Sequence, residues 1–176
     1  MKKAWMAMVL GALLLGTMAG AVWARPKQML AGNRKLAIGP AAFEPAFDGY
    51  DYQIITWEMG KDTAYMSTTG DYDEYVAPVV FPTLSPVTVK KITLIVNDMN
   101  ETDRCRALLY RGNPDKMNAA EMAIVKSELS APAPLRYSVD TIQNATVWPS
   151  HAPVVRLELR QNMKFYGVII EYQVNS

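Results

Sequence analysis

Two short clusters combine tyrosines with carboxylates, residue types that together can bind or cleave sugars. Residues 48–52 read Asp-Gly-Tyr-Asp-Tyr, and residues 71–75 read Asp-Tyr-Asp-Glu-Tyr. A tyrosine ring offers a flat apolar face to a sugar ring, while a carboxylate accepts hydrogen bonds from sugar hydroxyls. A tryptophan that precedes a proline in an expected loop is a further candidate for an exposed contact. The candidate ligand-binding residues are therefore Tyr50, Asp51, Tyr72, Asp73 and Trp148.

Two other interpretations of these clusters stay open. A pair of carboxylates can hydrolyse a glycosidic bond, one as the acid and the other as nucleophile or base, but only at a suitable separation. Alternatively, the clusters bind no ligand, because Asp-Gly and Gly-Asp pairs are common in turns and tyrosine is common in strands. The sequence gives no carboxylate separation, so hydrolysis is the weakest of the three interpretations.

Catalytic and metal-binding patterns are otherwise scarce. His151 is the only histidine and Cys105 the only cysteine, so the chain lacks the ligand set of a zinc site. No G-x-S-x-G motif is present, and a serine beside His151 does not by itself make a catalytic triad. Residues 98–103, Asp-Met-Asn-Glu-Thr-Asp, gather oxygen ligands that suit calcium, or they form a solvated polar turn. We predict the polar turn, no metal or cofactor, and no enzymatic activity.

The N-terminus has the layout of a secretory signal peptide. A lysine pair after the initial methionine forms a positive n-region, Trp5 to Leu15 is apolar, and Val22-Trp23-Ala24 provides a cleavage site before Arg25. The apolar run is too short to be read as a membrane span. We therefore predict that residues 1–24 are removed and that the protein is exported, to the periplasm or outside the cell.

The predicted mature chain, residues 25–176, has the composition of one globular domain. It contains 16 of the 18 Lys and Arg residues and all 17 Asp and Glu residues, so its net charge is −1. That charge does not create the positive field that holds a nucleic-acid backbone. No second apolar run approaches membrane-spanning length. We expect neither nucleic-acid binding nor a membrane span in the mature chain.

Cys105 lies in a run, residues 104–110, that we interpret as a strand. A single thiol cannot form an internal disulfide, so the core must be stable without one. We predict that Cys105 is a small buried hydrophobic side chain. The alternative is an intermolecular disulfide, or a thiol activated by the arginines on either side of it.

From residue 50 onward the chain consists of short β-like runs separated by turn residues. In residues 154–160, apolar side chains alternate with charged ones, as in a strand that buries one face. Seven or eight such runs predict an all-β fold, an antiparallel β-sandwich or jelly roll. We assign residues 48–176 to this domain. Residues 25–47 are expected to be an irregular arm or linker, with one short strand near its end at most.

Two local features carry further expectations. Gln161 and Asn162 separate the runs 154–160 and 165–174, which we predict to pair as a hairpin. Residues 118–129 fit a helix with a capping asparagine, or a strand that follows a turn, and we favour the strand. The face shared within the last run would contain Tyr166, Val168, Ile170, Tyr172 and Val174.

The order of these patterns resembles a loose group of exported bacterial β-sandwich proteins, mostly uncharacterised, over about residues 75–174. The likeness rests on Tyr75 to Pro82, the Asn97-Asp98 turn, Leu109-Tyr110-Arg111 and the closing run Tyr166 to Tyr172. Leu84-Ser85-Pro86 replaces the glycine-rich turn of that group, which affects a loop more than the fold. The resemblance implies a β-sandwich and no catalytic residues.

These observations together predict a non-enzymatic exported protein with a binding or structural role in the cell envelope or outside the cell. A carbohydrate-binding module is the alternative function. The sequence leaves open whether the partner is a protein or a glycan. Because uncovered sheet edges tend to associate, a homo-oligomer is also an option.

Overall fold

The computed structural model describes residues 32–46, 56–59, 64–68, 71–114, 117–131 and 133–175. These residues belong to one unit that spans Ala31–Ser176. The predicted signal peptide, residues 1–24, lies outside the described residues, as do Tyr50 and Asp51. In the described part, no helix is long and apolar enough to cross a membrane.

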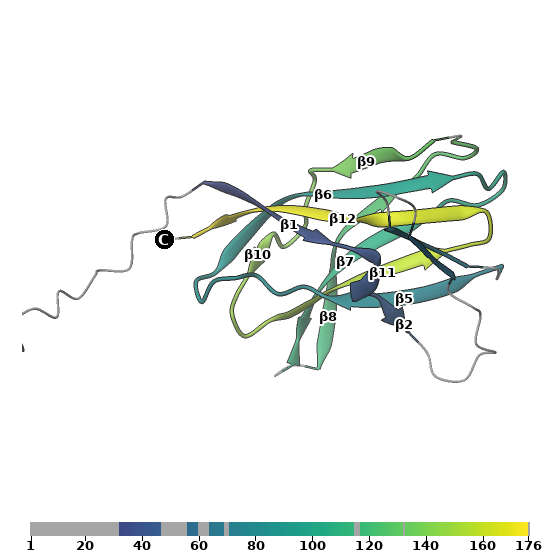
Figure 1. Cartoon of the computed structure of the whole chain (residues 1–176). Helices are drawn as coiled ribbons and strands as arrows, with labels where there is room; N and C mark the ends of the chain where they lie inside the picture. Colours follow the sequence, from purple (N-terminus) through teal and green to yellow (C-terminus); the bar gives the residue numbers. More distant parts are fainter. Residues whose placement is uncertain are drawn as a thin grey trace, which may run out of the picture. The chain divides into compact units, whose positions relative to one another are not determined.

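The strands form two antiparallel sheets, of which the larger has seven strands (Figure 1). Its centre is the pair β6 (Val87–Asp98) and β12 (Met163–Val174), each 12 residues long. β9 and β10 pair with β6, β1 and β4 pair with β12, and β3 continues the sheet beyond β4. These flanking strands are β1 (Asn33–Ile38), β3 (Thr56–Met59), β4 (Ala64–Ser67), β9 (Leu135–Val139) and β10 (Thr146–Val147).

The smaller sheet has five strands in the order β2-β5-β11-β7-β8. They are β2 (Glu44–Pro45), β5 (Asp73–Pro78), β7 (Arg106–Asn113), β8 (Asn118–Lys126) and β11 (Ala152–Leu159). The short 3-10 turn η1 (Pro40–Ala42) packs against β4 and β12. One face of the five-stranded sheet packs on the core, and its other face points away from the core.

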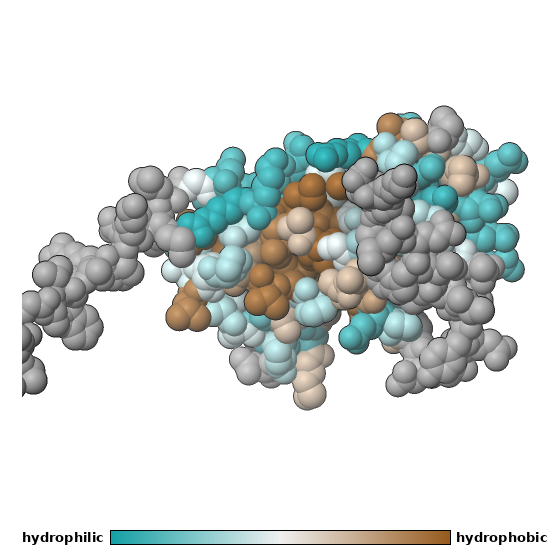
Figure 2. Space-filling view, viewed as in Figure 1, coloured by the Kyte–Doolittle hydropathy of each residue, from teal (hydrophilic) through white to brown (hydrophobic). Residues whose placement is uncertain are grey.

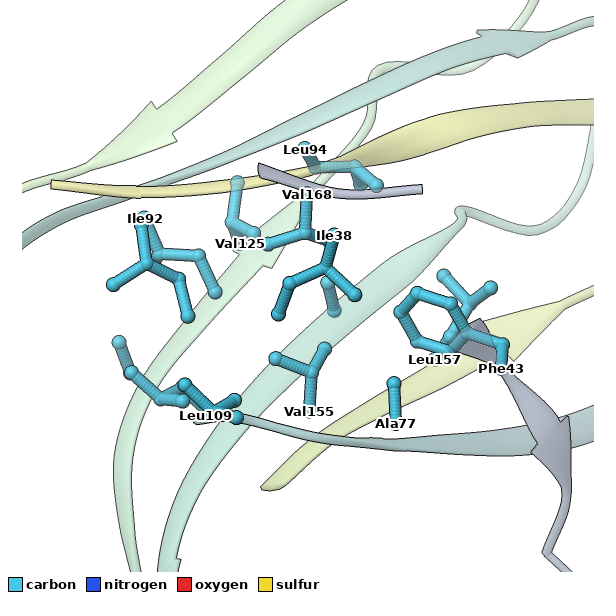
Figure 3. Packing of buried hydrophobic residues seen from close by; sticks show 14 of the residues in the cluster. Ile38, Phe43, Ala77, Ile92, Leu94, Leu109, Val125, Val155, Leu157 and Val168 are labelled. Atoms are coloured by element: carbon cyan, nitrogen blue, oxygen red, sulfur yellow. The ribbon is translucent and has the colours of Figure 1, made fainter. Parts of the chain in front are cut away.

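The core fills the space between the two sheets (Figure 3). In β11, Val155 and Leu157 are fully buried, while Arg156 between them points away from the core. They face Ile92 and Leu94 of β6 and Val168 of β12 across the sandwich. This period-two burial is what makes two facing sheets stable without helices. The prediction of an all-β antiparallel sandwich is confirmed.

One strand lies where the sequence indicated an irregular arm. Residues 33–38 form β1, so the prediction for residues 25–47 is wrong in this segment. β1 pairs along its whole length with β12, from Asn33 opposite Gln173 to Ile38 opposite Val168. The run contains polar residues and lies between glycines, so its own propensity for a strand is weak. Hydrogen bonds to β12 therefore stabilise this strand, although its own strand propensity is weak.

The predicted hairpin of residues 154–160 and 165–174 is also wrong. β11 and β12 follow one another in the chain but belong to different sheets, so the exposed turn at residues 161–162 connects one sheet to the other. A bulge in β12 at Gly167, whose φ is +149°, shifts the alternation there. Phe165 is therefore buried, and Tyr166 is not on the core face with Val168.

The preferred strand at residues 118–129 is confirmed as β8, residues 118–126. β8 pairs with β7 as a hairpin, and the preceding Met117 takes a positive φ of 47° in the turn. Pairing with β7 decides between the helix and the strand, which local propensity left open.

Candidate functional site

The described candidate residues lie at two ends of the five-stranded sheet. Asp73 begins β5 and pairs with Leu159 at the end of β11, and Tyr72 precedes it. Trp148 lies in the loop that leads into the opposite end of β11, at Ala152. β11 is eight residues long, so its two ends are seven residue steps apart, roughly 23 Å. The structure therefore does not bring Tyr72 and Asp73 together with Trp148 in one site.

Asp73 is part of the local structure. Its Oδ2 accepts hydrogen bonds from the hydroxyl of Thr68 and, at 3.3 Å, from the hydroxyl of Tyr75. Burial of Tyr75, together with the charge of Asp73, raises the pKa of the phenol to about 12. The Asp73 carboxylate thus joins the end of β4 to the start of β5.

Tyr72 is more open, with 43% of the residue exposed. Its hydroxyl donates to Oε1 of Glu74, and the guanidinium carbon of Arg160 lies 4.8 Å from the centre of its ring. Burial and the hydrogen bond to Glu74 raise the pKa of Tyr72. The ring is fixed by both contacts, so it forms a rigid aromatic surface at the margin of the sheet.

The outer face of the five-stranded sheet carries a connected group of side chains, here called the Arg156 face. It consists of Glu74, Arg106, Tyr110, Arg156 and Glu158. The register places them together, because Glu158 pairs with Glu74 on one side and with Arg106 on the other. Side chains at paired positions project from the same face of a sheet. Three strands, β5, β11 and β7, thus contribute to one surface.

Arg156 is the centre of this face. Its Nη2 donates to Oε1 of Glu158 at 2.9 Å, and its Nη1 lies 3.8 Å from Oε2 of Glu74. Arg106 Nη1 lies 3.4 Å from the other oxygen of Glu158, and the Arg156 guanidinium carbon lies 5.6 Å from the centre of the Tyr110 ring. Burial opposes the charge of Arg156, but Glu74, Tyr110 and Glu158 outweigh it and raise the pKa of the guanidinium.

None of the five residues of the Arg156 face was among the candidate ligand-binding residues predicted from the sequence. The signal that pointed toward it was the alternation in residues 154–160, which puts Arg156 and Glu158 on one side of a strand. Nothing in the sequence indicated that Arg106 and Tyr110 would be their neighbours. Those contacts depend on the pairing of β11 with β7.

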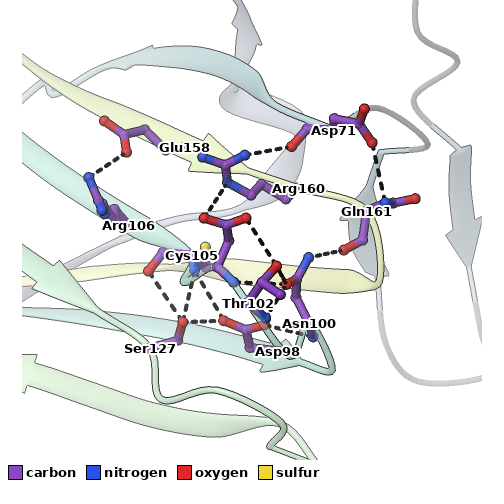
Figure 4. Close-up of polar contacts among 11 residues, drawn as sticks. Asp71, Asp98, Asn100, Thr102, Cys105, Arg106, Ser127, Glu158, Arg160 and Gln161 are labelled. Atoms are coloured by element: carbon purple, nitrogen blue, oxygen red, sulfur yellow. Dashed lines mark hydrogen bonds and ion pairs between the residues drawn. The ribbon is translucent and has the colours of Figure 1, made fainter.

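The turn at residues 98–103 buries Asp98 and Asn100 and exposes Met99, Glu101 and Thr102, so the predicted polar turn is solvated in part. Asp98 is fully buried and accepts hydrogen bonds from the backbone N–H groups of Asn100 and Cys105, both at 3.1 Å, and from the hydroxyl of Ser127 (Figure 4). Oδ1 of Asn100 accepts from the N–H groups of Thr102 and Asp103, both at 2.9 Å. The side-chain oxygens of Asp98 and Asn100 therefore hold the loop itself. Among the described residues, no three His, Cys, Asp or Glu residues are placed to hold a metal ion.

The loop of Trp148 is held in place by side chains around it. Nδ1 of His151 accepts the backbone N–H of Trp148 at 3.1 Å, and the N–H of His151 donates to the carbonyl of Trp148 at 2.9 Å. Arg111 Nη1 donates to the carbonyl of Thr146 at 3.0 Å. Burial, together with the charge of Arg111, lowers the pKa of His151. Trp148 itself is 54% exposed, so this loop presents its indole to solvent.

The chain matches no protein-family profile and no curated protein. Among solved structures it is similar to the CBM36-1 domain of a multidomain xylanase from the hindgut metagenome of Trinervitermes trinervoides, with a TM-score of 0.46 and 11% identity over 78% of this chain and 96% of that one. It is also similar to the xylan-binding module CBM15, with a TM-score of 0.45 and 16% identity over 82% of this chain and 99% of that one. At such identities the likeness concerns the β-sandwich alone.

Proposed function

We propose that this chain is an exported, non-enzymatic β-sandwich that binds a glycan on the Arg156 face. The observation that carries the proposal is the arrangement of two tyrosine rings, Tyr72 and Tyr110, around the Glu74 and Glu158 carboxylates. Each ring has an arginine guanidinium near it, at 4.8 Å for Tyr72 and 5.6 Å for Tyr110. The two arginine side chains are the more exposed groups of the face, at 48% for Arg106 and 34% for Arg156, and Glu74 and Glu158 lie beneath them.

The chemistry of the face suits a sugar. Sugar rings have apolar faces that pack on tyrosine and hydroxyls that exchange hydrogen bonds with carboxylates and guanidinium groups. The arginine contacts fix Glu74 and Glu158 before a ligand arrives, which lowers the entropy lost on binding. Each carboxylate oxygen also has a second lone pair for a ligand hydroxyl.

The same contacts disfavour hydrolysis. Each of the four carboxylate oxygens of Glu74 and Glu158 already has a contact with an arginine or with the Tyr72 hydroxyl. A glycosidase needs one carboxyl group that holds a proton and delivers it to the leaving group. No oxygen of either carboxylate is left without such a contact, so binding without turnover is the expected behaviour.

Electrophoresis in native gels that contain single polysaccharides tests this proposal. We expect retardation in at least one glycan, and a loss of affinity of about tenfold or more in Tyr110→Ala. Arg156→Lys keeps the charge but loses the planar fork, so it should also bind more weakly. Tyr166→Ala, on the other sheet, is the matched control and should bind normally. A blank glycan panel would leave a protein-binding or structural role in the envelope, to be traced by cross-linking.

Export is tested separately by the mass of the secreted protein. The proposed signal peptide predicts that the mature chain begins at Arg25 and is found in the periplasm or the medium. A secreted chain that still begins at Met1 would contradict this part of the proposal.

A further inference from the structure

The outer face of the five-stranded sheet is polar, in contrast to the space between the sheets, where apolar residues (brown) gather in Figure 2. Besides the Arg156 face, the strand at each edge adds charged side chains to it. β8 adds Glu121, which pairs with Tyr110 of β7. It also adds Lys126, which pairs with Arg106. β2 adds Glu44 through its pairing with β5.

The charges on this outer face nearly cancel. Among the described strand residues, those that the register places there are Glu44, Glu74, Arg106, Glu121, Lys126, Arg156 and Glu158. Three cations against four anions give a net charge of −1. The turn between β7 and β8 does not alter this balance, because residues 115–116, which lie outside the described residues, are one Asp and one Lys. The face therefore creates no strong field for a charged ligand.

The charges of the Arg156 face are also layered. The side chains of Arg106 and Arg156 are the exposed ones, while those of Glu158 and Glu74 are 10% and 14% exposed. A polycation would meet the guanidinium groups first, and a polyanion would approach the two carboxylates beneath them. Like charges at short range disfavour both kinds of ligand.

Arg156 is not free to hold an acidic group with its fork. Its Nη1 lies 3.8 Å from Glu74, its Nη2 donates to Glu158 at 2.9 Å, and its Nε is buried. A carboxylate or sulfate is held best by two neighbouring N–H groups of one guanidinium. Each such pair in Arg156 includes a nitrogen that is buried or directed at a glutamate. A sugar hydroxyl needs a single proton, and each Nη nitrogen carries a second one.

The two tyrosine rings lie at the ends of a line of contacts. The centre of the Tyr110 ring is 5.6 Å from the Arg156 guanidinium carbon, and Arg156 Nη1 is 3.8 Å from one oxygen of Glu74. The other oxygen of Glu74 accepts the hydroxyl of Tyr72. Along β11, the partner of Tyr110 and the partner of the residue after Tyr72 are five residue steps apart, roughly 17 Å. A ligand that packs on both rings must therefore be longer than one sugar ring.

We propose, on the basis of the glycan site proposed above, that the ligand is an uncharged polysaccharide that crosses β5, β11 and β7 from Tyr72 to Tyr110. The apolar faces of its sugars pack on the two rings, and its hydroxyls exchange hydrogen bonds with the arginine and glutamate groups between them. Because no net attraction between charges contributes, the affinity depends little on salt.

Affinity gels with two groups of polysaccharides test the ligand class. Glucomannan, mannan, laminarin and hydroxyethyl cellulose are uncharged, and alginate, polygalacturonate, hyaluronan and carboxymethyl cellulose are acidic. The two cellulose derivatives share a backbone, so they differ mainly in charge. We expect at least one uncharged polysaccharide to retard the protein more strongly than every acidic one. Calorimetry with that polysaccharide should give affinities within about twofold of each other in 50 mM and 500 mM NaCl.

An acidic polysaccharide that retards the protein as strongly as any uncharged one, or binding that disappears in high salt, would overturn this proposal. If such binding were lost in Tyr110→Ala, the glycan site itself would still stand. Panels without retardation in either group would refute glycan binding as a whole. The two proposals can therefore be told apart by their failures.

Charge variants outside the Arg156 face give a second test. Glu121→Lys changes the net charge of the outer face from −1 to +1, and Lys126→Glu changes it to −3. Both should bind the uncharged polysaccharide within about twofold of the unchanged chain. A gain in the first variant together with a loss in the second would show that charge drives binding and would overturn the proposal.

The path across the sheet is tested by the second ring. Tyr72→Ala should weaken binding of the polysaccharide about fivefold or more, and its free monosaccharides should not compete. Tyr166→Ala is again the control, and circular dichroism shows whether each variant is folded. Full affinity in Tyr72→Ala, or competition by a monosaccharide, would contradict a ligand that extends between the two rings.

Discussion

Replacing Asp98 with alanine should strongly destabilise the protein, because this carboxylate joins three loops at the end of the sandwich opposite Trp148. One oxygen accepts the N–H of Asn100 at 3.1 Å, and the other accepts the N–H of Cys105 at 3.1 Å and the hydroxyl of Ser127. Asp98 is fully buried and has no cation within ion-pair distance among the described residues. Its charge is balanced by these hydrogen bonds.

The magnitude follows from which donors lose their partner. The N–H of Cys105 keeps a second acceptor, the Ser127 oxygen at 2.8 Å, and the Ser127 hydroxyl keeps the carbonyl of Cys105 at 3.3 Å. The N–H of Asn100 is the donor that loses its acceptor outright. A hydrogen bond to a charged group contributes about 1.5–3 kcal/mol, so the loss of one such bond and the exchange of two others for neutral partners give on the order of 3–6 kcal/mol. Removal of the carboxylate also relieves the cost of burying a charge. We therefore expect the free energy of unfolding to fall by about 3 kcal/mol.

Urea-induced equilibrium unfolding, followed by tryptophan fluorescence and circular dichroism, measures this loss. Asp103→Ala is the control in the same loop. Its carboxylate is 42% exposed and lies 3.5 Å from Arg160, so its loss should cost no more than about 1 kcal/mol. If Asp98→Ala cost as little as Asp103→Ala, the three loops would not depend on this carboxylate and the reasoning would be refuted.

Three further predictions concern single positions. Gly167→Ala should destabilise the protein by about 1–3 kcal/mol and speed hydrogen exchange in β1. The reason is that φ is +149° and that an added Cβ would lie 2.9 Å from the carbonyl oxygen of Ile38. Gly39→Ala, where an added Cβ would meet no atom within 4 Å, is the control and should have neither effect. Cys105 should resist Ellman's reagent until the protein is denatured, because it is buried and its pKa is raised, and a covalent dimer on a non-reducing gel would contradict this. Because the pKa of His151 is lower in the folded state than in the unfolded chain, the folded state resists protonation, and the free energy of unfolding should fall as the pH drops below about 6.5. His151→Gln should flatten that part of the stability curve, and an unchanged slope would show that other groups cause it.

The sequence alone determined the fold class and which face of most strands is buried. The alternation in residues 154–160 predicted that Val155 and Leu157 enter the core, because period-two burial is a local property of the strand. The prediction that Cys105 is a small buried hydrophobic side chain was also right, since a lone thiol in a core packs as a small hydrophobic group.

The tertiary structure alone decided which strands are neighbours. An alternating strand states which side is buried but not which strand it pairs with, so β11 and β12 were assigned to one hairpin although they lie in different sheets. For the same reason the sequence did not place Arg106 and Tyr110 beside Arg156, or Ser127 beside Asp98. Each of these contacts joins residues far apart in the chain, and pairing between distant strands has no local signature. The strands could therefore be predicted from the sequence, whereas the surfaces proposed to bind ligands exist only once the sheets have assembled.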